Sequence, residues 1–410
     1  MKSNLFNHGK SIGGNLPRCA ILIALIVMTG SCDLNPEDQP IRGEIVSATA
    51  LGSYTSEQIA TIITLAGFDN SSDPQFAVDA YRIIYETIDP AGADVKASGA
   101  LFVPVGGPAY PLLSLQHGTV TERDAVASVH PYNSGEGFIG LIAASRGYCT
   151  AVPDYLGYGQ SELLHPYLHA RSLASAVIDF IRAGRNFCRE REIDLDDRLF
   201  LTGYSEGGYA TLATHREIEQ NFSDEFNLTA VAPMAGPYDL TGTVDSIFQD
   251  SDYTQPLYPA FILAAYADIY DELRLADIFQ PPYAELIPGL FDGTSDYDQI
   301  TAILPGTLGD LFHDDFISGY LGGNEPELTA ILRENTLLDW HPSVPLTFFH
   351  GDADETVPYY NALTAVANLS ATSTAAVNLV TIPGGSHGTA ILSAFSGMFE
   401  WLAGFESLAQ

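Results

Sequence analysis

The stretch with the clearest chemical signature runs from Arg198 to Thr211 and contains the sequence Gly203-Tyr-Ser-Glu-Gly. A short apolar run precedes this G-x-S-x-G pattern and small helix-forming residues follow it, which indicates a strand, a sharp turn and a helix with Ser205 at the turn. Such a turn is strained and leaves no room for side chains at Gly203 and Gly207. The pattern predicts a nucleophilic serine that attacks a carbonyl carbon and forms a covalent acyl intermediate.

A serine hydroxyl needs an imidazole to take its proton and a carboxylate to orient that imidazole. Two later strand-like runs end in loops that carry these groups. The first loop contains Asp352 and Asp354, and the second contains His387. Because the carboxyl ends of parallel strands meet at one edge of a sheet, we expect Ser205, His387 and one of the two aspartates to lie together.

These stretches resemble those of the α/β-hydrolases, and within that superfamily they are most similar to the secretory lipases. The resemblance extends from about Ala77 to the C-terminus. It rests, in chain order, on Ala80-Tyr-Arg-Ile-Ile-Tyr, Gly99-Ala-Leu-Phe-Val-Pro, Gln116-His-Gly-Thr, Ala151-Val-Pro-Asp-Tyr-Leu-Gly-Tyr-Gly, the Ser205 turn, His350-Gly-Asp-Ala-Asp and Gly385-Ser-His-Gly. It implies an α/β-hydrolase fold: a mostly parallel central sheet, helices on both faces and a helical cap inserted before the acid-bearing strand.

The resemblance also assigns roles within the site. Similar enzymes carry H-G-x-x-D, which selects Asp354 as the catalytic acid and leaves Asp352 as a turn residue. In them the oxyanion hole takes one backbone N–H from the residue after the nucleophile and a second from the loop that follows an earlier strand. Carried over, the two donors are the backbone amides of Glu206 and Thr119. We interpret His117 and Asp154 as structural residues that fix loops.

The segment from residue 237 to residue 341 is longer than one strand-to-strand connection requires. We interpret it as a helical cap or lid on an α/β-hydrolase core made of residues 51–236 and 342–410. Apolar residues at helical spacing predict one helix from about Tyr258 to Phe279, ended by Pro281-Pro282. An apolar cap would exclude water and shape an acyl or aryl pocket, although the same residues could also attach the cap to the core.

Several elements precede the site residues. Thr55-Ser-Glu-Gln has the capping-box pattern and predicts a helix to about Leu65. Two alternating runs, from Val78 to Thr87 and from Val95 to Val103, predict an antiparallel hairpin.

Residues 1–31 have the pattern of a secretory signal: Lys2, Lys10 and Arg18 without an acid, then a short apolar core. The ending Gly30-Ser31-Cys32 resembles a lipoprotein processing site, at which Cys32 would receive the lipid. Ordinary cleavage without a lipid is the alternative. We interpret residues 32–50 as a tether and expect an outer-membrane or cell-surface lipoprotein, or otherwise a periplasmic or extracellular protein.

The composition argues against a nucleic-acid partner. The formal net charge is −34 at pH 7, and it becomes −37 without the three basic residues of the signal. Lys96 is then the only lysine. Such a surface repels phosphate backbones and anionic lipids, so we expect no nucleic acid and contact with a membrane only through an N-terminal lipid anchor.

Cys149 and Cys188 are the two cysteines that lie outside the signal and its processing site. Cys149 opens one strand and Cys188 closes the helix that runs back after it, so both should lie at the bottom of the sheet. The sequence leaves two alternatives open: a disulfide formed in an oxidising compartment, or two buried free thiols.

Together these features predict a serine carboxylic ester hydrolase, a lipase or an esterase. We expect a monomer that acts on a small-molecule or lipid ester and needs neither a cofactor nor a metal. The alternatives are an esterase that removes acetyl or feruloyl groups from a polysaccharide, a serine peptidase of the same fold, and a surface binding protein without catalysis.

Overall fold

The computed structural model describes residues 41–66 and 74–405. The predicted signal at residues 1–31, the lipidation site Cys32 and the first part of the predicted tether lie outside the described residues. Within the described ranges, no helix combines the length and the apolar character needed to cross a membrane.

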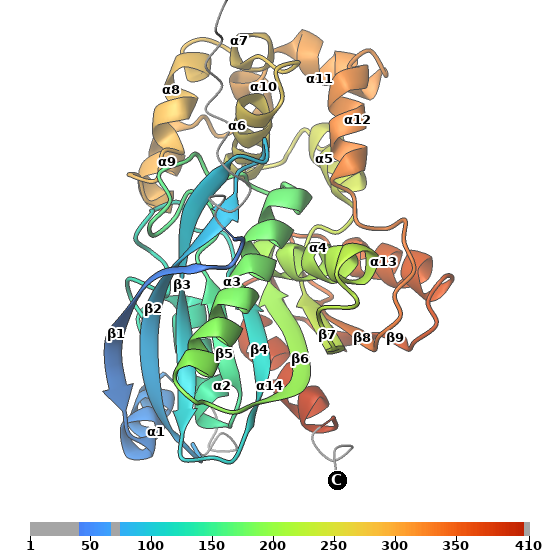
Figure 1. Ribbon diagram of the computed structural model, residues 1–410. Coiled ribbons are helices and arrows are strands. Elements are labelled where there is room, and N and C mark those ends of the chain that lie inside the picture. Colours follow the sequence, from blue (N-terminus) through green and yellow to red (C-terminus); the bar gives the residue numbers. More distant parts are fainter. Residues whose placement is uncertain (1–40, 67–73, 406–410) are drawn as a thin grey trace, which may run out of the picture. The chain divides into compact units, whose positions relative to one another are not determined.

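A nine-stranded sheet in the order β1-β2-β3-β5-β4-β6-β7-β8-β9 organises the chain (Figure 1). The pairs from β1 to β5 are antiparallel, and the pairs from β5 to β9 are parallel. This arrangement confirms the expected mostly parallel sheet. The strands are β1 (Ile45–Tyr54), β2 (Ala77–Ile88), β3 (Asp94–Val105), β4 (Tyr110–Gln116), β5 (Cys149–Pro153), β6 (Leu195–Tyr204), β7 (Leu228–Met234), β8 (Leu346–Gly351) and β9 (Val377–Ile382).

Helices cover both faces of this sheet (Figure 1). On one face lie α3 (Ala170–Glu190), α4 (Glu206–Asn221) and α13 (Tyr360–Ser370), and their apolar side chains share one cluster with the strands. On the other face lie α1 (Ser56–Leu65), α2 (Gly135–Ser145) and α14 (Ile391–Ala403), which form a second cluster. The central strands β4 and β5 are buried throughout, which is why they read as unbroken apolar runs rather than alternating ones.

The N-terminal elements agree with the sequence except at one strand. The capping box at Thr55 starts α1, and β2 and β3 form the predicted antiparallel hairpin. The predicted tether at residues 32–50 is wrong from Ile45 onward, because β1 pairs with β2. This edge strand consists largely of small, half-exposed residues, so its apolar alternation is weak, and the open edge of β2 supplies its hydrogen bonds.

Eight helices lie between β7 and β8, and we call residues 240–334 the helical insert. The predicted single helix over 258–279 is wrong: α6 ends at Ile269 and α7 begins at Leu275. Tyr270 is extended, packs against His169 and accepts a hydrogen bond from Asn335, and these tertiary contacts interrupt the helix. The insert comprises α5 (Leu240–Gln249), α6 (Leu257–Ile269), α7 (Leu275–Ile278), α8 (Tyr283–Leu290), α9 (Tyr297–Ile303), α10 (Leu308–Leu311), α11 (Asp314–Leu321) and α12 (Pro326–Glu334).

Candidate active site

A strained turn between β6 and α4 presents Ser205. Its backbone has φ 62° and ψ −123°, and its N–H donates to the carbonyl of Met234 at 2.9 Å. A Cβ atom at Gly203 would lie 2.5 Å from the carbonyl oxygen of Gly207 and 2.6 Å from that of Gln116. A Cβ atom at Gly207 would also collide with the Gln116 carbonyl. The close approach of three backbone segments therefore explains both glycines of the pattern.

The loops after β8 and β9 bring two further groups to Ser205. His387 Nε2 lies 2.9 Å from Ser205 Oγ, and His387 Nδ1 lies 2.7 Å from Asp354 Oδ2. Asp352 does not join this relay, since its Oδ1 accepts from the N–H of Gly384 at 2.6 Å. The structure thus places Asp354, and not Asp352, behind the imidazole.

Asp354 is buried and receives several hydrogen bonds. Its Oδ1 accepts from the backbone N–H groups of Thr356 and Val357 at 3.0 and 2.9 Å, and its Oδ2 also lies 3.2 Å from His350 Nε2. Burial alone would raise the pKa of Asp354, but the hydrogen bonds from His350 and His387 outweigh it and lower the pKa to about 2. The carboxylate is therefore ionised at neutral pH.

Sequence reasoning missed His350 as a residue of the site. Its Nε2 lies 2.8 Å from the carbonyl of Val357 as well as near Asp354. Because a carbonyl only accepts, this nitrogen carries a hydrogen, and it faces the same carboxylate oxygen, Oδ2, that His387 contacts. The signal was present in the sequence, since His350 stands four residues before Asp354 in the quoted H-G-x-x-D stretch.

Tyr204, next to the nucleophile, holds the histidine loop. Its hydroxyl donates to the carbonyl of His387 at 2.7 Å, and the two rings lie 5.3 Å apart. Burial, aided by the charge of Asp354, raises the pKa of Tyr204, so the phenol remains a donor. The turn that presents the serine is in this way tied directly to the loop that presents the base.

The expected oxyanion donors lie beside Ser205: Glu206 is the first residue of α4, and Thr119 follows Gly118, where a Cβ atom would lie 3.7 Å from the Cβ of Ser205. In the described part of the chain, neither the backbone N–H of Thr119 nor that of Glu206 has a hydrogen-bond acceptor. The preceding amide, that of Gly118, differs because it donates to Glu136 Oε1 at 2.9 Å. Two unpaired N–H groups near a nucleophile are what a developing oxyanion requires.

His117 shapes the loop that carries Thr119. Its ring nitrogens contact the carbonyls of Gly118 at 2.7 Å and Asp154 at 3.1 Å, and its ring stacks on Tyr155 at 4.1 Å. The Asp154 carboxylate accepts from the Ser98 hydroxyl at 2.6 Å. These contacts fit the structural interpretation of His117 and Asp154.

A small, partly open cavity of about 30 Å³ adjoins Ser205. The core contributes residues around the nucleophile, and the helical insert contributes aromatic and aliphatic side chains. The lining consists of Tyr167, Leu168, Ser205, Glu206, Pro237, Thr243, Ile247, Tyr253, Tyr258, Ile262, Thr356 and Val357. One water molecule needs about 10–15 Å³ of such space, so the cavity has room for a small group.

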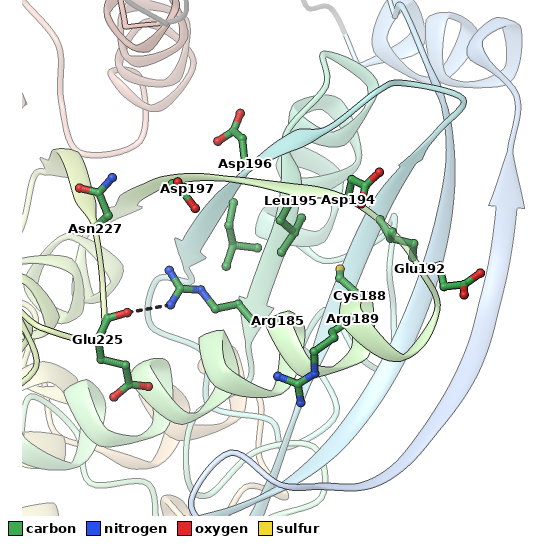
Figure 2. A pocket seen from close by; sticks show the side chains of 12 residues that line it. Arg185, Cys188, Arg189, Glu192, Asp194, Leu195, Asp196, Asp197, Glu225 and Asn227 are labelled. Carbon is green, nitrogen blue, oxygen red and sulfur yellow. Dashed lines mark hydrogen bonds between the residues drawn. The ribbon is translucent and has the colours of Figure 1, made fainter.

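A larger hollow of about 550 Å³ lies at the other end of β6, far from Ser205. Figure 2 shows Arg185 and Arg189 on α3, and Asp194, Asp196 and Asp197 around the start of β6. Arg185 donates to the carbonyl of Glu225 at 3.2 Å. The hollow lies at the amino ends of the parallel strands, opposite the edge at which α/β sheets place their sites.

Cys188 also lines this hollow (Figure 2), and its thiol contacts that of Cys149. Both thiols are free and buried, and their sulfur atoms lie 3.7 Å apart. The hydrogen bond from Cys188, together with burial, raises the pKa of Cys149 well above its usual range. The pair lies at the bottom of the sheet, as expected, and neither thiol is near Ser205.

The sheet order, the strained serine turn and the Ser205–His387–Asp354 relay define the chain as an α/β-hydrolase. Residues 138–404 match the sequence model of the secretory lipase family. The chain belongs to this family and is a hydrolase of the lipase and esterase class. A comparison with curated protein sequences gives no match.

Solved structures agree with the family. The rice cell wall degrading esterase LipA from Xanthomonas oryzae is 32% identical, with a TM-score of 0.78 over 88% of this chain and 95% of its own. A candidate hydrolase from Legionella pneumophila is 28% identical, with a TM-score of 0.81 over 89% of this chain and 99% of its own. Candida antarctica lipase A is 17% identical, with a TM-score of 0.63 over 87% of this chain and 83% of its own, and shares the fold.

Proposed function

We propose that this protein is an exported serine esterase that cleaves carboxylic esters through an acyl-enzyme on Ser205. The observation that carries the proposal is the continuous relay from Ser205 Oγ to His387 and on to Asp354, with distances of 2.9 and 2.7 Å. Because Asp354 is ionised and only accepts, His387 carries its hydrogen on Nδ1. The lone pair on Nε2 therefore faces the serine hydroxyl and is able to take its proton.

The reaction would proceed in two halves. Ser205 Oγ attacks the ester carbonyl as His387 takes its proton, and the oxyanion forms against the backbone N–H groups of Thr119 and Glu206. His387 then gives the proton to the leaving alkoxide, which departs as the alcohol. A water molecule, deprotonated by His387, attacks the acyl-enzyme and releases the acid and Ser205. Asp354 stabilises the imidazolium in both halves.

The cavity beside Ser205 favours a short acyl group. Its volume of about 30 Å³ suits a small acyl group such as acetyl, whereas a long acyl chain would require Tyr253 and Tyr258 of the helical insert to move. In this proposal the insert acts as the cap over the site and excludes water from it. The family match favours esters over peptide bonds as substrates.

A second candidate function is an esterase that removes acetyl or feruloyl groups from polysaccharide. The observation that favours it is the 32% identity over 88% of this chain to a rice cell wall degrading esterase. Release of acetate from acetylated xylan, compared with turnover of nitrophenyl acetate, distinguishes the two candidates. If the protein hydrolyses the nitrophenyl ester but releases no acetate from xylan, the result favours an esterase of small-molecule substrates.

The localisation extends the same proposal. The basic and apolar pattern of residues 1–31, together with membership of a family of secretory lipases, supports export. Cys32 would carry a lipid anchor. Metabolic labelling with an alkyne fatty acid should mark the wild-type chain and not Cys32→Ser, and equal labelling of both would exclude this anchor.

The test of the proposed activity uses nitrophenyl esters from acetate to palmitate, with emulsified triglyceride alongside and Ser205→Ala as the blank. We expect the wild-type protein to hydrolyse the short esters and Ser205→Ala to lose turnover while its circular dichroism spectrum is unchanged. Turnover that survives in Ser205→Ala would exclude the acyl-enzyme mechanism. Turnover on palmitate and triglyceride would instead show that the insert opens.

A further inference from the structure

The carboxyl group of Glu206 is buried beside the nucleophile, at the first residue of α4. Its side chain is 0% exposed, and its Oε1 lies 2.6 Å from Nε2 of His165. Its Oε2 has no hydrogen-bond partner among the residues that the structure describes. Burying a carboxyl group costs free energy unless the group is paired. For Glu206, the hydrogen bond with His165 is what offsets this cost.

The hydrogen bonds of His165 fix the number of protons on this pair. Its Nδ1 lies 2.7 Å from the carbonyl oxygen of Leu156, and a carbonyl only accepts, so Nδ1 carries a hydrogen. The ring lone pair and a carboxylate oxygen would repel each other at the 2.6 Å between Nε2 and Glu206 Oε1, so this contact requires one further proton between them. Whether it resides on the ring or on the carboxyl group, His165 and Glu206 together carry no net charge.

This pair contains one expected oxyanion donor and lies one residue, Tyr167, away from the other. Glu206 contributes its own backbone N–H, and the ring of His165 lies 6.1 Å from that of Tyr167. The Tyr167 hydroxyl lies 3.0 Å from Thr119 Oγ1. Glu206 and Tyr167 also line the same cavity beside Ser205.

We propose that His165 and Glu206 form a charge-neutral pair with two effects on the developing oxyanion. The pair positions the Glu206 backbone N–H, and it leaves no unpaired negative charge on the Glu206 carboxyl group. The proposal rests on the acyl-enzyme mechanism given above. An ionised carboxylate in the lining of the cavity beside Ser205 would repel a negatively charged oxyanion, and burial strengthens such repulsion. Pairing with His165 removes this repulsion, and the 2.6 Å hydrogen bond fixes the start of α4. Both side chains are positioning residues.

A second buried pair on the same helix provides a matched control. His215 Nε2 lies 2.8 Å from Glu219 Oε1, and the His215 side chain is fully buried. This pair lies toward the other end of α4, where Glu219 also accepts from the N–H of Ser343 at 2.9 Å. Breaking it removes a buried histidine–glutamate contact from α4 without changing the charge next to Ser205.

The test compares His165→Gln, the double variant His165→Gln/Glu206→Gln, and His215→Gln in the full chain. The readouts are kcat and KM for nitrophenyl butyrate, and the inhibition constant of phenylboronic acid, whose tetrahedral adduct with the serine is an anion. Loss of one oxyanion donor lowers kcat by about 10²–10³-fold. A displaced donor should lower it less, so we expect His165→Gln to lose about 10–100-fold in kcat with KM nearly unchanged.

The other readouts separate charge from folding. Boronic acid binding should weaken in parallel with kcat in His165→Gln, and the double variant should recover about tenfold in kcat because the unpaired charge is gone. His215→Gln should change neither kcat nor boronic acid binding. Equal kcat in His165→Gln and His215→Gln, or a double variant no better than His165→Gln, would overturn the proposal.

A shorter acid keeps the proposal testable if His165→Gln does not fold. Glu206→Asp keeps the charge but withdraws the carboxyl group from His165, so it should lose more in kcat than Glu206→Gln, and equal losses would overturn the proposal. The wild-type protein separates this inference from the proposed function. A wild-type chain without turnover refutes the function, whereas normal wild-type turnover with the variants behaving like His215→Gln refutes only the pair.

Discussion

Replacing Asp354 by asparagine perturbs the orientation of the base with almost no change in volume. In the wild-type chain, Oδ1 accepts from the N–H groups of Thr356 and Val357, and Oδ2 accepts from His387 Nδ1 at 2.7 Å. The asparagine oxygen would keep the two backbone donors, so its NH₂ group would face His387. His387 would then accept at Nδ1 and carry its hydrogen on Nε2, where it could no longer take the proton of Ser205.

The expected loss follows from this change of tautomer. A wrong tautomer in such a triad lowers kcat by about 10⁴-fold, which corresponds to about 5 kcal/mol of transition-state stabilisation. The assay is the initial rate of nitrophenyl butyrate hydrolysis as a function of substrate concentration. The loss should fall on kcat, because the carboxylate does not touch the substrate.

Asp352→Asn is the matched control. Asp352 lies two residues away and accepts from the N–H of Gly384 at 2.6 Å, so its replacement should change kcat by no more than about threefold. If Asp354→Asn keeps more than about a tenth of the wild-type kcat, the reasoning is wrong. A loss of several orders of magnitude in Asp352→Asn would assign the acid to the other aspartate.

Three further predictions concern the pocket, the carboxylate and the thiols. Tyr258→Ala should enlarge the cavity and raise the rate on octanoate relative to acetate by about tenfold; an unchanged ratio would mean that the acyl chain lies elsewhere. The pKa of Asp354 is about 2 in the folded state, which is below that of an unfolded carboxyl group. The ionised carboxylate therefore stabilises the folded state fully above about pH 4, and this contribution is lost as the pH falls through 2. The difference in the free energy of unfolding between wild type and Asp354→Asn should therefore narrow from pH 4 to 2, and a constant difference would contradict this. Burial and the raised pKa of Cys149 suppress its thiolate, so iodoacetamide should not label Cys149 or Cys188 in the folded protein. Labelling of either cysteine in the folded protein would contradict the structure. Labelling after unfolding without a reductant distinguishes two thiols, which react, from a disulfide, which does not.

The core strands and the serine turn could be predicted because their constraints are local. Gly203 and Gly207 are required by backbone contacts within one strand-turn-helix unit, and the fully buried strands carry unbroken apolar runs. The strand β1 could not be predicted, because its residues carry little apolar signal and its place depends on the open edge of β2. The break after α6 likewise depends on contacts of Tyr270 with residues distant in the chain.

The candidate site divides in the same way. Ser205, Asp354 and His387 each stand in a short sequence pattern, so they could be identified as one candidate site from the sequence alone. His165 stands in no such pattern, and its partner Glu206 lies 41 positions further along the chain. Only the fold places the two side chains in contact, and from the sequence His165 is one histidine among ten.

The most direct test of the central claim is chemical labelling of the nucleophile. A fluorophosphonate reacts only with an activated serine, so peptide mass spectrometry should find a single adduct on Ser205 in the wild-type protein and none in Ser205→Ala. The label should also be lost from His387→Ala, in which Ser205 keeps its place but lacks its base. An unlabelled wild-type protein, or an adduct on another residue, would contradict the account.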